Sequence, residues 1–221
     1  MAKVLRLFVM ISLIAVLIVA GVFTYTGYSY YQAVKEERPL VATITSIQKQ
    51  DRYVELSEIS PYFLNALLAI EDRRFFTHFG FDPISIIRAS VTNLVAKDIV
   101  QGGSTITQQL AKNLFFSSSQ TYLRKMAEVF MALDIERNYS KEEILEVYSN
   151  IIYLGEGYYG VQDASKGYFK KTPDNLTIEE AAFIAGLAQA PTLYSNNIEL
   201  GKKRQQIVLD ALDDFELVVF D

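Results

Sequence analysis

The most apolar stretch of the chain lies at its N-terminus. Leu7 to Gly27 is an uncharged run of roughly twenty residues, preceded by Lys3 and Arg6, and a helix of that length spans a bilayer. The flanking charges after it, residues 35–38, are of mixed sign. The positive-inside rule therefore favours a cytoplasmic N-terminus. We predict that residues 1–30 are a cytoplasmic start and a single transmembrane anchor, with the remaining chain exported.

A cleaved signal peptide is the alternative to an anchor. The apolar run is long for a signal peptide, and Ile18-Val19-Ala20 lacks the small-x-small pattern of a cleavage site. After the anchor, Thr43 to Val54 alternates apolar and polar residues, which indicates a weak strand or an extended linker. We therefore predict a linker or extended segment over residues 31–54 and one domain over 55–221.

From Ser60 onward the apolar spacing is helical. Ser60-Pro61 combines an N-cap with proline at the first helical position, and the apolar face that follows predicts a helix ending at Glu71. A second helix is expected over Pro83 to Val95 and a longer one over Tyr122 to Asn138. On the latter, one stripe is predicted to be buried in the core: Leu123, Met126, Phe130 and Leu133.

Capping boxes predict three further helix starts. Thr105 with Gln108, Ser140 with Glu143, and Thr177 with Glu180 each place a hydroxyl three residues before a Gln or Glu. The first of these helices is expected to reach about Leu114, and the serine-rich stretch 116–121 after it reads as a mobile loop. Strand signals are sparse after residue 55, so the fold class is mostly α.

Composition narrows the range of functions. The chain has 221 residues and half of them are hydrophobic, which is enough for one folded domain with a cleft. The net charge of -5 argues against a nucleic-acid partner. No cysteine is present, so disulfides, thiolate zinc sites and a cysteine nucleophile are excluded.

Glu71 is the first candidate for chemistry. A carboxylate at a helix C-terminus, next to apolar side chains, has its pKa raised and suits a general base or acid. The alternative is a surface ion pair with Arg73 or Arg74. His78, the only histidine, reads as a hydrogen-bonded structural residue, because one histidine cannot make a histidine-based metal site.

A glycine pair opens the second candidate region. Gly102-Gly103 precedes a helix N-terminus, where unpaired N–H groups attract anions, and Lys112 lies one turn from Gln108 on the same face. The stretch matches neither a P-loop nor a GxGxxG fingerprint, so nucleotide binding is disfavoured. An ordinary glycine turn that caps a helix is the alternative.

Three charges on the 122–138 helix form the third candidate. Arg124, Lys125 and Glu128 lie within about one turn. They could be a surface ion pair, or the bases could hold a phosphate while Glu128 orients an acceptor or binds a divalent ion. The local pattern leaves both open.

Taken together, these segments resemble the glycosyltransferase domain of bacterial cell-wall synthases, found alone as monofunctional transglycosylases or fused to penicillin-binding transpeptidases. The resemblance covers residues 55–195 and five ordered motifs. The motifs are Glu71-Asp72-Arg73-Arg74-Phe75 with His78, Gly80 and Asp82; Gly102 through Asn113; Arg124-Lys125-x-x-Glu128; Lys141-x-x-Ile144-Leu145-Glu146-x-Tyr148-x-Asn150; and Gly157-x-Tyr159-Gly160-Val161 with Tyr168-Phe169.

The resemblance implies a lysozyme-like, two-lobed helical domain on the outer face of a bacterial inner membrane. Its implied reaction joins lipid-linked disaccharide-pentapeptide (lipid II) to a glycan on polyprenyl diphosphate, with inversion. By position, Glu71 is the general base and Glu128 supports the acceptor or a metal. The implied substrate-binding residues are Ser104, Thr105, Gln108, Gln109, Lys112, Asn113, Arg124 and Lys125.

A divalent cation, Mg²⁺ or Mn²⁺, is the implied cofactor, with Glu128 as its ligand, and no organic cofactor is expected. The implied partners are the lipid-linked glycans, membrane lipids and other cell-wall synthesis proteins, and nucleic acid is not among them. A hydrophobic lobe is expected to lie against the membrane.

Some positions depart from the family pattern. The stretch 117–120 lacks a basic residue that members often carry, and Tyr148-Ser149-Asn150 replaces Tyr-Leu-Asn. No SxxK motif follows the domain, so we expect a monofunctional chain or a piece of a longer synthase. Two other functions stay open. One is a glycan-cleaving enzyme of lysozyme-like fold, and the other is a catalytically silent membrane scaffold.

Overall fold

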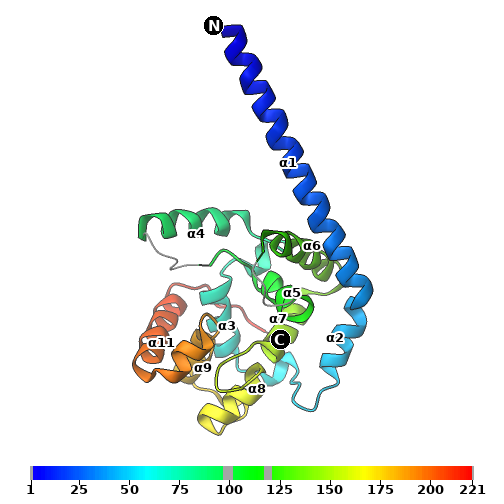
Figure 1. Ribbon diagram of the computed structural model, residues 1–221. Helices are drawn as coiled ribbons and strands as arrows, with labels where there is room; N and C mark the ends of the chain where they lie inside the picture. Colours follow the sequence, from blue (N-terminus) through cyan, green and yellow to red (C-terminus); the bar gives the residue numbers. More distant parts are fainter. Residues whose placement is uncertain (1, 97–101, 117–120, 221) are drawn as a thin grey trace.

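A long helix, α1 (Ala2–Glu37), projects from a helical body in the computed structural model (Figure 1). The structure describes residues 2–96, 102–116 and 121–220. Within these ranges the only β-structure is two isolated bridges, Phe79 with Phe81 and Tyr153 with Tyr159. The mostly helical fold class is therefore confirmed.

The six predicted helices of the body form in the expected order, as α3, α4, α5, α6, α7 and α9. The boundaries predicted around residues 60–71, 83–95, 105–114 and 122–138 agree with the structure to within about two residues. The helices are α2 (Leu40–Gln48), α3 (Pro61–Glu71), α4 (Pro83–Ala96), α5 (Ile106–Phe115), α6 (Tyr122–Asn138), α7 (Lys141–Ile151), α8 (Gly160–Ala164), α9 (Ile178–Leu187), α10 (Pro191–Asn196) and α11 (Ile198–Asp213). Short 3₁₀ turns and one π turn (Ser165–Phe169) join them. The predicted mobile loop at 116–121 lies largely outside the described residues.

All three predicted capping boxes form. At the start of α5 the Thr105 hydroxyl oxygen accepts the Gln108 N–H at 3.1 Å, and the Gln108 side chain accepts the Thr105 N–H at 3.0 Å. The same reciprocal pair begins α7 at Ser140 and α9 at Thr177. Each box satisfies two backbone donors that a helix start leaves unpaired, which explains why these boundaries could be read locally.

Helix α3 lies at the centre of the body, with α9 and α11 packed against it. Its side chains Phe63, Leu64, Leu67 and Leu68 have no exposed surface. The small residues of α9, among them Ala181 and Ala185, are also fully buried, and their size permits this close packing. A second group, α5, α6 and α7, packs together, and α5 meets the C-terminal end of α3 through the hydrogen bond of Gln109 to Glu71.

The C-terminal segment also packs on α3. Asn65 donates its amide to the Val218 carbonyl at 3.0 Å and accepts the Val218 N–H at 2.7 Å. The Phe220 ring lies 6.4 Å from that of Phe76. The segment after α11 is thereby tied to the core.

The prediction of a strand or extended linker at 43–54 was wrong for its first half, because α2 occupies Leu40 to Gln48. Leu40, Ile44 and Ile47 are buried and share one helical face at i, i+4 and i+7. Alternation among β-branched residues mimicked a strand, and burial of this helical face outweighs β-propensity.

The predicted buried stripe of α6 was also wrong in its target. Its residues are only partly buried, whereas Ala127, Met131 and Ile135 have no exposed surface and face the core. The stripe instead meets α1, where the ring of Phe130 lies 5.3 Å from that of Tyr28. Helix α1 therefore covers the apolar stripe of α6 that the sequence pattern identified.

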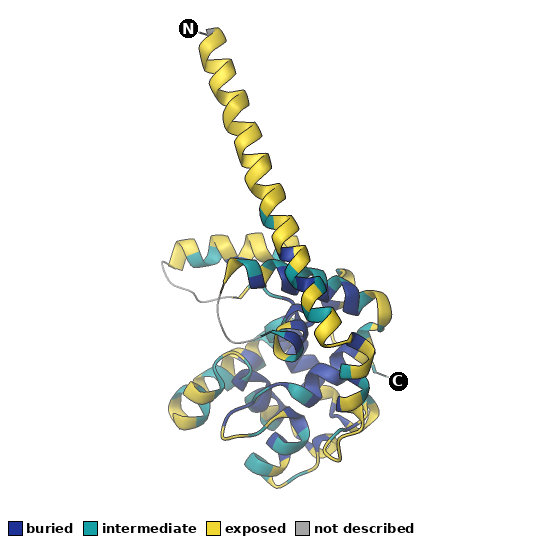
Figure 2. Cartoon of the chain, turned by 45° about the vertical axis from the view of Figure 1, so that its right-hand side comes forward, coloured by how far each residue is buried: buried dark blue, intermediate teal, exposed yellow. Residues whose placement is uncertain are grey.

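The contact between α1 and α6 is close and specific. A Cβ added at Gly27 would lie 2.7 Å from Cβ of Met126, and Lys35 pairs with Asp134 at 2.7 Å. The part of α1 before this contact is apolar and exposed (Figure 2). That part is long and apolar enough to cross a membrane, so α1 fits a membrane anchor fixed to α6 at its base.

We predict that Gly27→Leu lowers the stability of the full chain in detergent by about 1–3 kcal/mol, because the new side chain cannot fit against α6. Thermal unfolding checks this. Gly21→Leu is the matched control, since a Cβ at Gly21 meets nothing within 4 Å. Equal unfolding temperatures for the two variants would contradict the prediction.

Candidate active site

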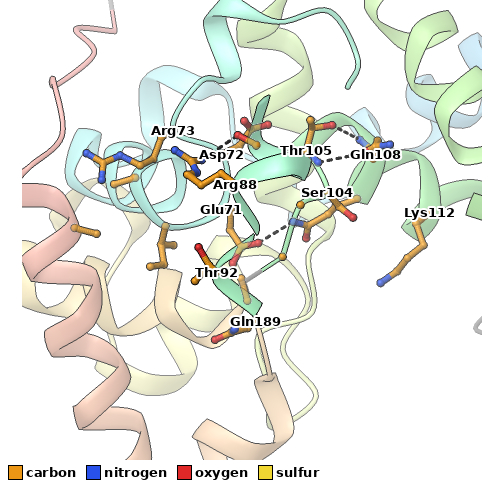
Figure 3. A pocket seen from close by; sticks show the side chains of 18 of the residues that line it. Glu71, Asp72, Arg73, Arg88, Thr92, Ser104, Thr105, Gln108, Lys112 and Gln189 are labelled. Atoms are coloured by element: carbon orange, nitrogen blue, oxygen red, sulfur yellow. Dashed lines mark hydrogen bonds between the residues drawn. The ribbon is translucent and has the colours of Figure 1, made fainter. Parts of the chain in front are cut away.

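A cleft of about 680 Å³ lies where the C-terminal end of α3 meets α5, α6 and α11. Glu71 points into it, with Arg73 and Arg88 on one side and Lys112 on the other (Figure 3). Of the ten predicted site residues, nine line this cleft: Glu71, Ser104, Thr105, Gln108, Gln109, Lys112, Arg124, Lys125 and Glu128. The fold thus brings together motifs that are up to 57 residues apart in the sequence.

Glu71 is the last residue of α3. Burial raises the pKa of its carboxyl group, and the Gln109 amide, which donates to Glu71 Oε2 at 2.7 Å, partly opposes that rise. The alternative of a surface pair does not hold, because Arg74 pairs with Asp82 at 2.9 Å and Arg73 donates to the Asp214 carbonyl. The carboxyl group is therefore suited to exchange a proton with a ligand.

Asp72, next in sequence, joins α3 to α5. Its carboxylate lies 3.0 Å from His78 Nε2 and accepts the Ile106 N–H at 2.9 Å. Asp72 and the His78 side chain are both nearly inaccessible to solvent. The reading of His78 as a structural residue is confirmed, and the anionic Asp72 stabilises the positive end of the α5 dipole.

Thr105 and Gln108 line the cleft but are 2% exposed, and their polar groups are largely used by the fold. Besides the capping box, the Thr105 hydroxyl donates to the Gly80 carbonyl at 2.7 Å. Gly103 permits close packing, since a Cβ there would lie 3.1 Å from Cα of Ile86. These residues shape the cleft wall more than they offer free groups to a ligand.

Part of the cleft lining is a cationic wall formed by α6 and the end of α5. Glu128 has no exposed surface and pairs with Arg124 at 3.0 Å and with Lys125 at 3.1 Å. Lys125 also donates to the Ser104 hydroxyl at 2.7 Å, and Lys112 extends into the cleft (Figure 3). Three cations face one anion on this wall, so it attracts negatively charged groups.

Asn113 is the predicted site residue that does not line the cleft. It is exposed, because one residue beyond Lys112 a helix has turned by about 100°. The cleft also contains residues that the motifs did not single out, notably Arg88 of α4 and Arg204 of α11. Arg204 acts electrostatically on Glu71, and no local sequence signal marks it because α11 reaches the cleft only through folding.

The side chains present do not fit a divalent cation held by the protein alone. Among the described residues, no three His, Asp or Glu side chains gather as a metal site would require. Both Glu128 oxygens already face cations, and a metal ion there would meet repulsion from Arg124 and Lys125. We therefore derive no chemical step through a metal.

Comparison with known proteins identifies the family of the chain. The family model described as Transglycosylase matches residues 37–213. The chain belongs to the transglycosylase family. Its mostly helical fold agrees with the lysozyme-like domain of that family, and the resemblance inferred from the motifs is confirmed.

Individual relatives carry the same signal. The chain is 47% identical over 162 residues to penicillin-binding protein 1A of Aquifex aeolicus, covering 72% of this chain and 22% of the relative. It is 37% identical over 234 residues to penicillin-binding protein 1A of Escherichia coli, covering 96% and 27%. A putative transglycosylase of Cupriavidus necator is 40% identical over 182 residues, covering 81% and 78%. The transglycosylase chain thus spans about a quarter of the penicillin-binding relatives.

We predict that Glu71→Gln stabilises the transglycosylase at pH 7. The pKa of Glu71 is raised on folding, so ionisation weakens the fold as pH rises above the ordinary range of a glutamate. Glutamine removes that penalty, and we expect Tm to rise by about 2–4 °C. At pH 4 the protonated glutamate resembles glutamine, and the difference should vanish. A Tm difference that is the same at both pH values would contradict the assignment.

We predict that Glu128→Gln destabilises the protein by about 3 kcal/mol, because it removes the charge that the mostly buried Arg124 faces. Chemical unfolding measures this. The matched control is Glu199→Gln, which breaks the exposed pair of Glu199 with Lys203 and should change stability by under about 1 kcal/mol. Similar losses in the two variants would show that the Glu128 pairs are not special.

Proposed function

We propose that this transglycosylase domain polymerises lipid-linked disaccharide-pentapeptide into glycan strands and releases polyprenyl diphosphate. One observation carries the proposal. A carboxyl group with a raised pKa, Glu71, shares a cleft with three cations, Lys112, Arg124 and Lys125. A base and an anion site in one cleft match a reaction that deprotonates an acceptor and expels a diphosphate.

In the proposed reaction Glu71 takes the proton from a sugar hydroxyl of the acceptor. The hydroxyl oxygen forms a new bond to the anomeric carbon of the donor glycan while the bond from that carbon to the diphosphate oxygen breaks. The diphosphate leaves with the electron pair, and attack from the opposite face inverts the anomeric centre. Each partner is held in the cleft, which converts a bimolecular encounter into a positioned one.

The cationic wall supports departure of the diphosphate. Lys112 and Lys125 are exposed to the cleft and can reach phosphate oxygens, while Glu128 holds Arg124 and Lys125 in place. Charge that develops on the leaving group meets preorganised positive charge. The sequence has no basic residue at 117–120. Lys112 and Lys125 therefore supply most of the positive charge that stabilises the leaving diphosphate in this proposal. A Mg²⁺ or Mn²⁺ requirement stays a prediction.

The lipid parts of both substrates call for a membrane nearby. Helix α4 lies at the end of the body from which α1 projects (Figure 1) and is largely exposed (Figure 2). Its apolar side chains Ile87, Leu94 and Val95 are 65%, 79% and 78% exposed, which suits contact with lipid. We propose that α1 spans the bacterial inner membrane and that the body lies on its outer face.

The alternatives explain less. A glycan-cleaving enzyme needs the carboxylate but has no use for a wall of cations. A silent scaffold needs neither, and has no use for a partly buried carboxyl group whose ionisation weakens the fold. The relatives' names, penicillin-binding protein and putative transglycosylase, also support glycan polymerisation.

We predict that the detergent-solubilised chain converts lipid-linked disaccharide-pentapeptide into long glycan, resolved by gel, and that Glu71→Gln lowers the rate by at least about 100-fold because the base is lost. Glu199→Gln, which changes an exposed glutamate on α11, should retain full activity. If neither the wild type nor Glu71→Gln forms glycan while both bind the lipid, the scaffold reading replaces ours. Shortening of preformed glycan would favour cleavage.

A further inference from the structure

A buried hydroxyl lies behind the proposed base. Tyr148 of α7 has no exposed surface, and its OH donates to Gln109 Oε1 at 2.7 Å. The other end of the same amide, Gln109 Nε2, donates to Glu71 Oε2 at 2.7 Å. Tyr148, Gln109 and Glu71 therefore form one hydrogen-bonded chain that runs from the core to the cleft.

The direction of this chain follows from the chemistry of its first member. Burial, together with the nearby negative charges of Glu71 and Asp72, raises the pKa of Tyr148 well above that of a free tyrosine. The hydroxyl therefore stays protonated over the working pH range. It lies within donating distance of the Gln109 carbonyl oxygen, and a glutamine amide has one donor end and one acceptor end.

We propose that Tyr148 is a positioning residue that fixes the Gln109 side chain so that its N–H, and not its carbonyl oxygen, faces the Glu71 carboxylate. The inference rests on the proposed function of Glu71 as the base. Without the Tyr148 hydroxyl, the Gln109 amide can rotate and place its carbonyl oxygen against the Glu71 carboxylate oxygen. That arrangement favours the protonated carboxyl group, which cannot act as a base.

Other charges also act on Glu71. Asp72 at the end of α3 disfavours ionisation of Glu71, and Lys112 of α5 and Arg204 of α11 favour it. None of these side chains changes in the variants below. A shift in the titration of Glu71 can therefore be traced to the amide rather than to these neighbours.

The test is the pH profile of kcat/KM for glycan formation by the full chain in detergent. We expect Tyr148→Phe to move the acidic limb to higher pH by about one unit, since a hydrogen bond to a charged group has that order of effect. The rate below the limb should fall about tenfold and recover toward wild type above it. Loss of packing alone would lower the rate at all pH values and leave the limb in place.

The matched control is Tyr168→Phe. Tyr168 is a partly buried tyrosine whose hydroxyl donates to the Leu154 carbonyl at 2.8 Å, and it does not line the cleft. We expect its limb to coincide with that of wild type. An equal shift in Tyr148→Phe and Tyr168→Phe would overturn the proposal, as would no shift in Tyr148→Phe.

A second variant keeps the test decisive if Tyr148→Phe folds poorly. Gln109→Met removes the amide at similar volume and should shift the limb in the same direction. In the double variant, loss of the Tyr148 hydroxyl should add nothing, because its effect passes through Gln109. An additive shift would overturn the proposal.

The experiments distinguish a failure of the proposed function from a failure of the positioning role of Tyr148. A wild type that forms no glycan at any pH removes the proposed function. An active wild type whose acidic limb is unmoved by Tyr148→Phe and by Gln109→Met removes only the positioning role. A limb moved by Gln109→Met but not by Tyr148→Phe shows that the amide keeps its orientation without the hydroxyl.

Discussion

The carboxylate of Asp72 joins the end of α3 to the start of α5, and the geometry of the cleft depends on that contact. The two helices come from segments 34 residues apart, between Asp72 and Ile106, and the contact places a negative charge at a positive helix end. His78 Nε2 also forms a hydrogen bond with the Asp72 carboxylate. Because this junction is buried and Asp72 is hydrogen-bonded from two sides, Glu71 at the end of α3 keeps a fixed position against Gln109 on α5.

The two glutamates of the cleft, Glu71 and Glu128, have different electrostatic surroundings. Desolvation raises the pKa of Glu71, and its hydrogen bond from Gln109 only partly offsets that rise. Glu128 is more deeply buried, yet it lies between Arg124 and Lys125 and serves as their counter-ion. The difference follows from position. Glu71 ends a helix whose partners are mostly apolar, whereas Glu128 shares a helix turn with two bases.

The anchor is part of this arrangement. Helix α6 carries the cationic wall, and α1 packs on another face of α6 through Gly27 and the pair of Lys35 with Asp134. The direction in which α1 leaves the body is therefore linked to the orientation of the cleft. The proposed function, in which both substrates come from a bilayer, gives a physical reason to couple the two.

The sequence by itself determined six of the body helices, their capping boxes, the apolar anchor and the family, because these depend on interactions within a few residues or on motif order. Only the tertiary structure decided that α2 is helical, that the stripe of α6 meets the anchor, that Arg204 reaches the cleft and that Asn113 does not. Those outcomes depend on which faces are buried against one another. The hydrogen-bonded chain from Tyr148 through Gln109 to Glu71 joins three helices, and contacts between distant segments leave no local pattern to read.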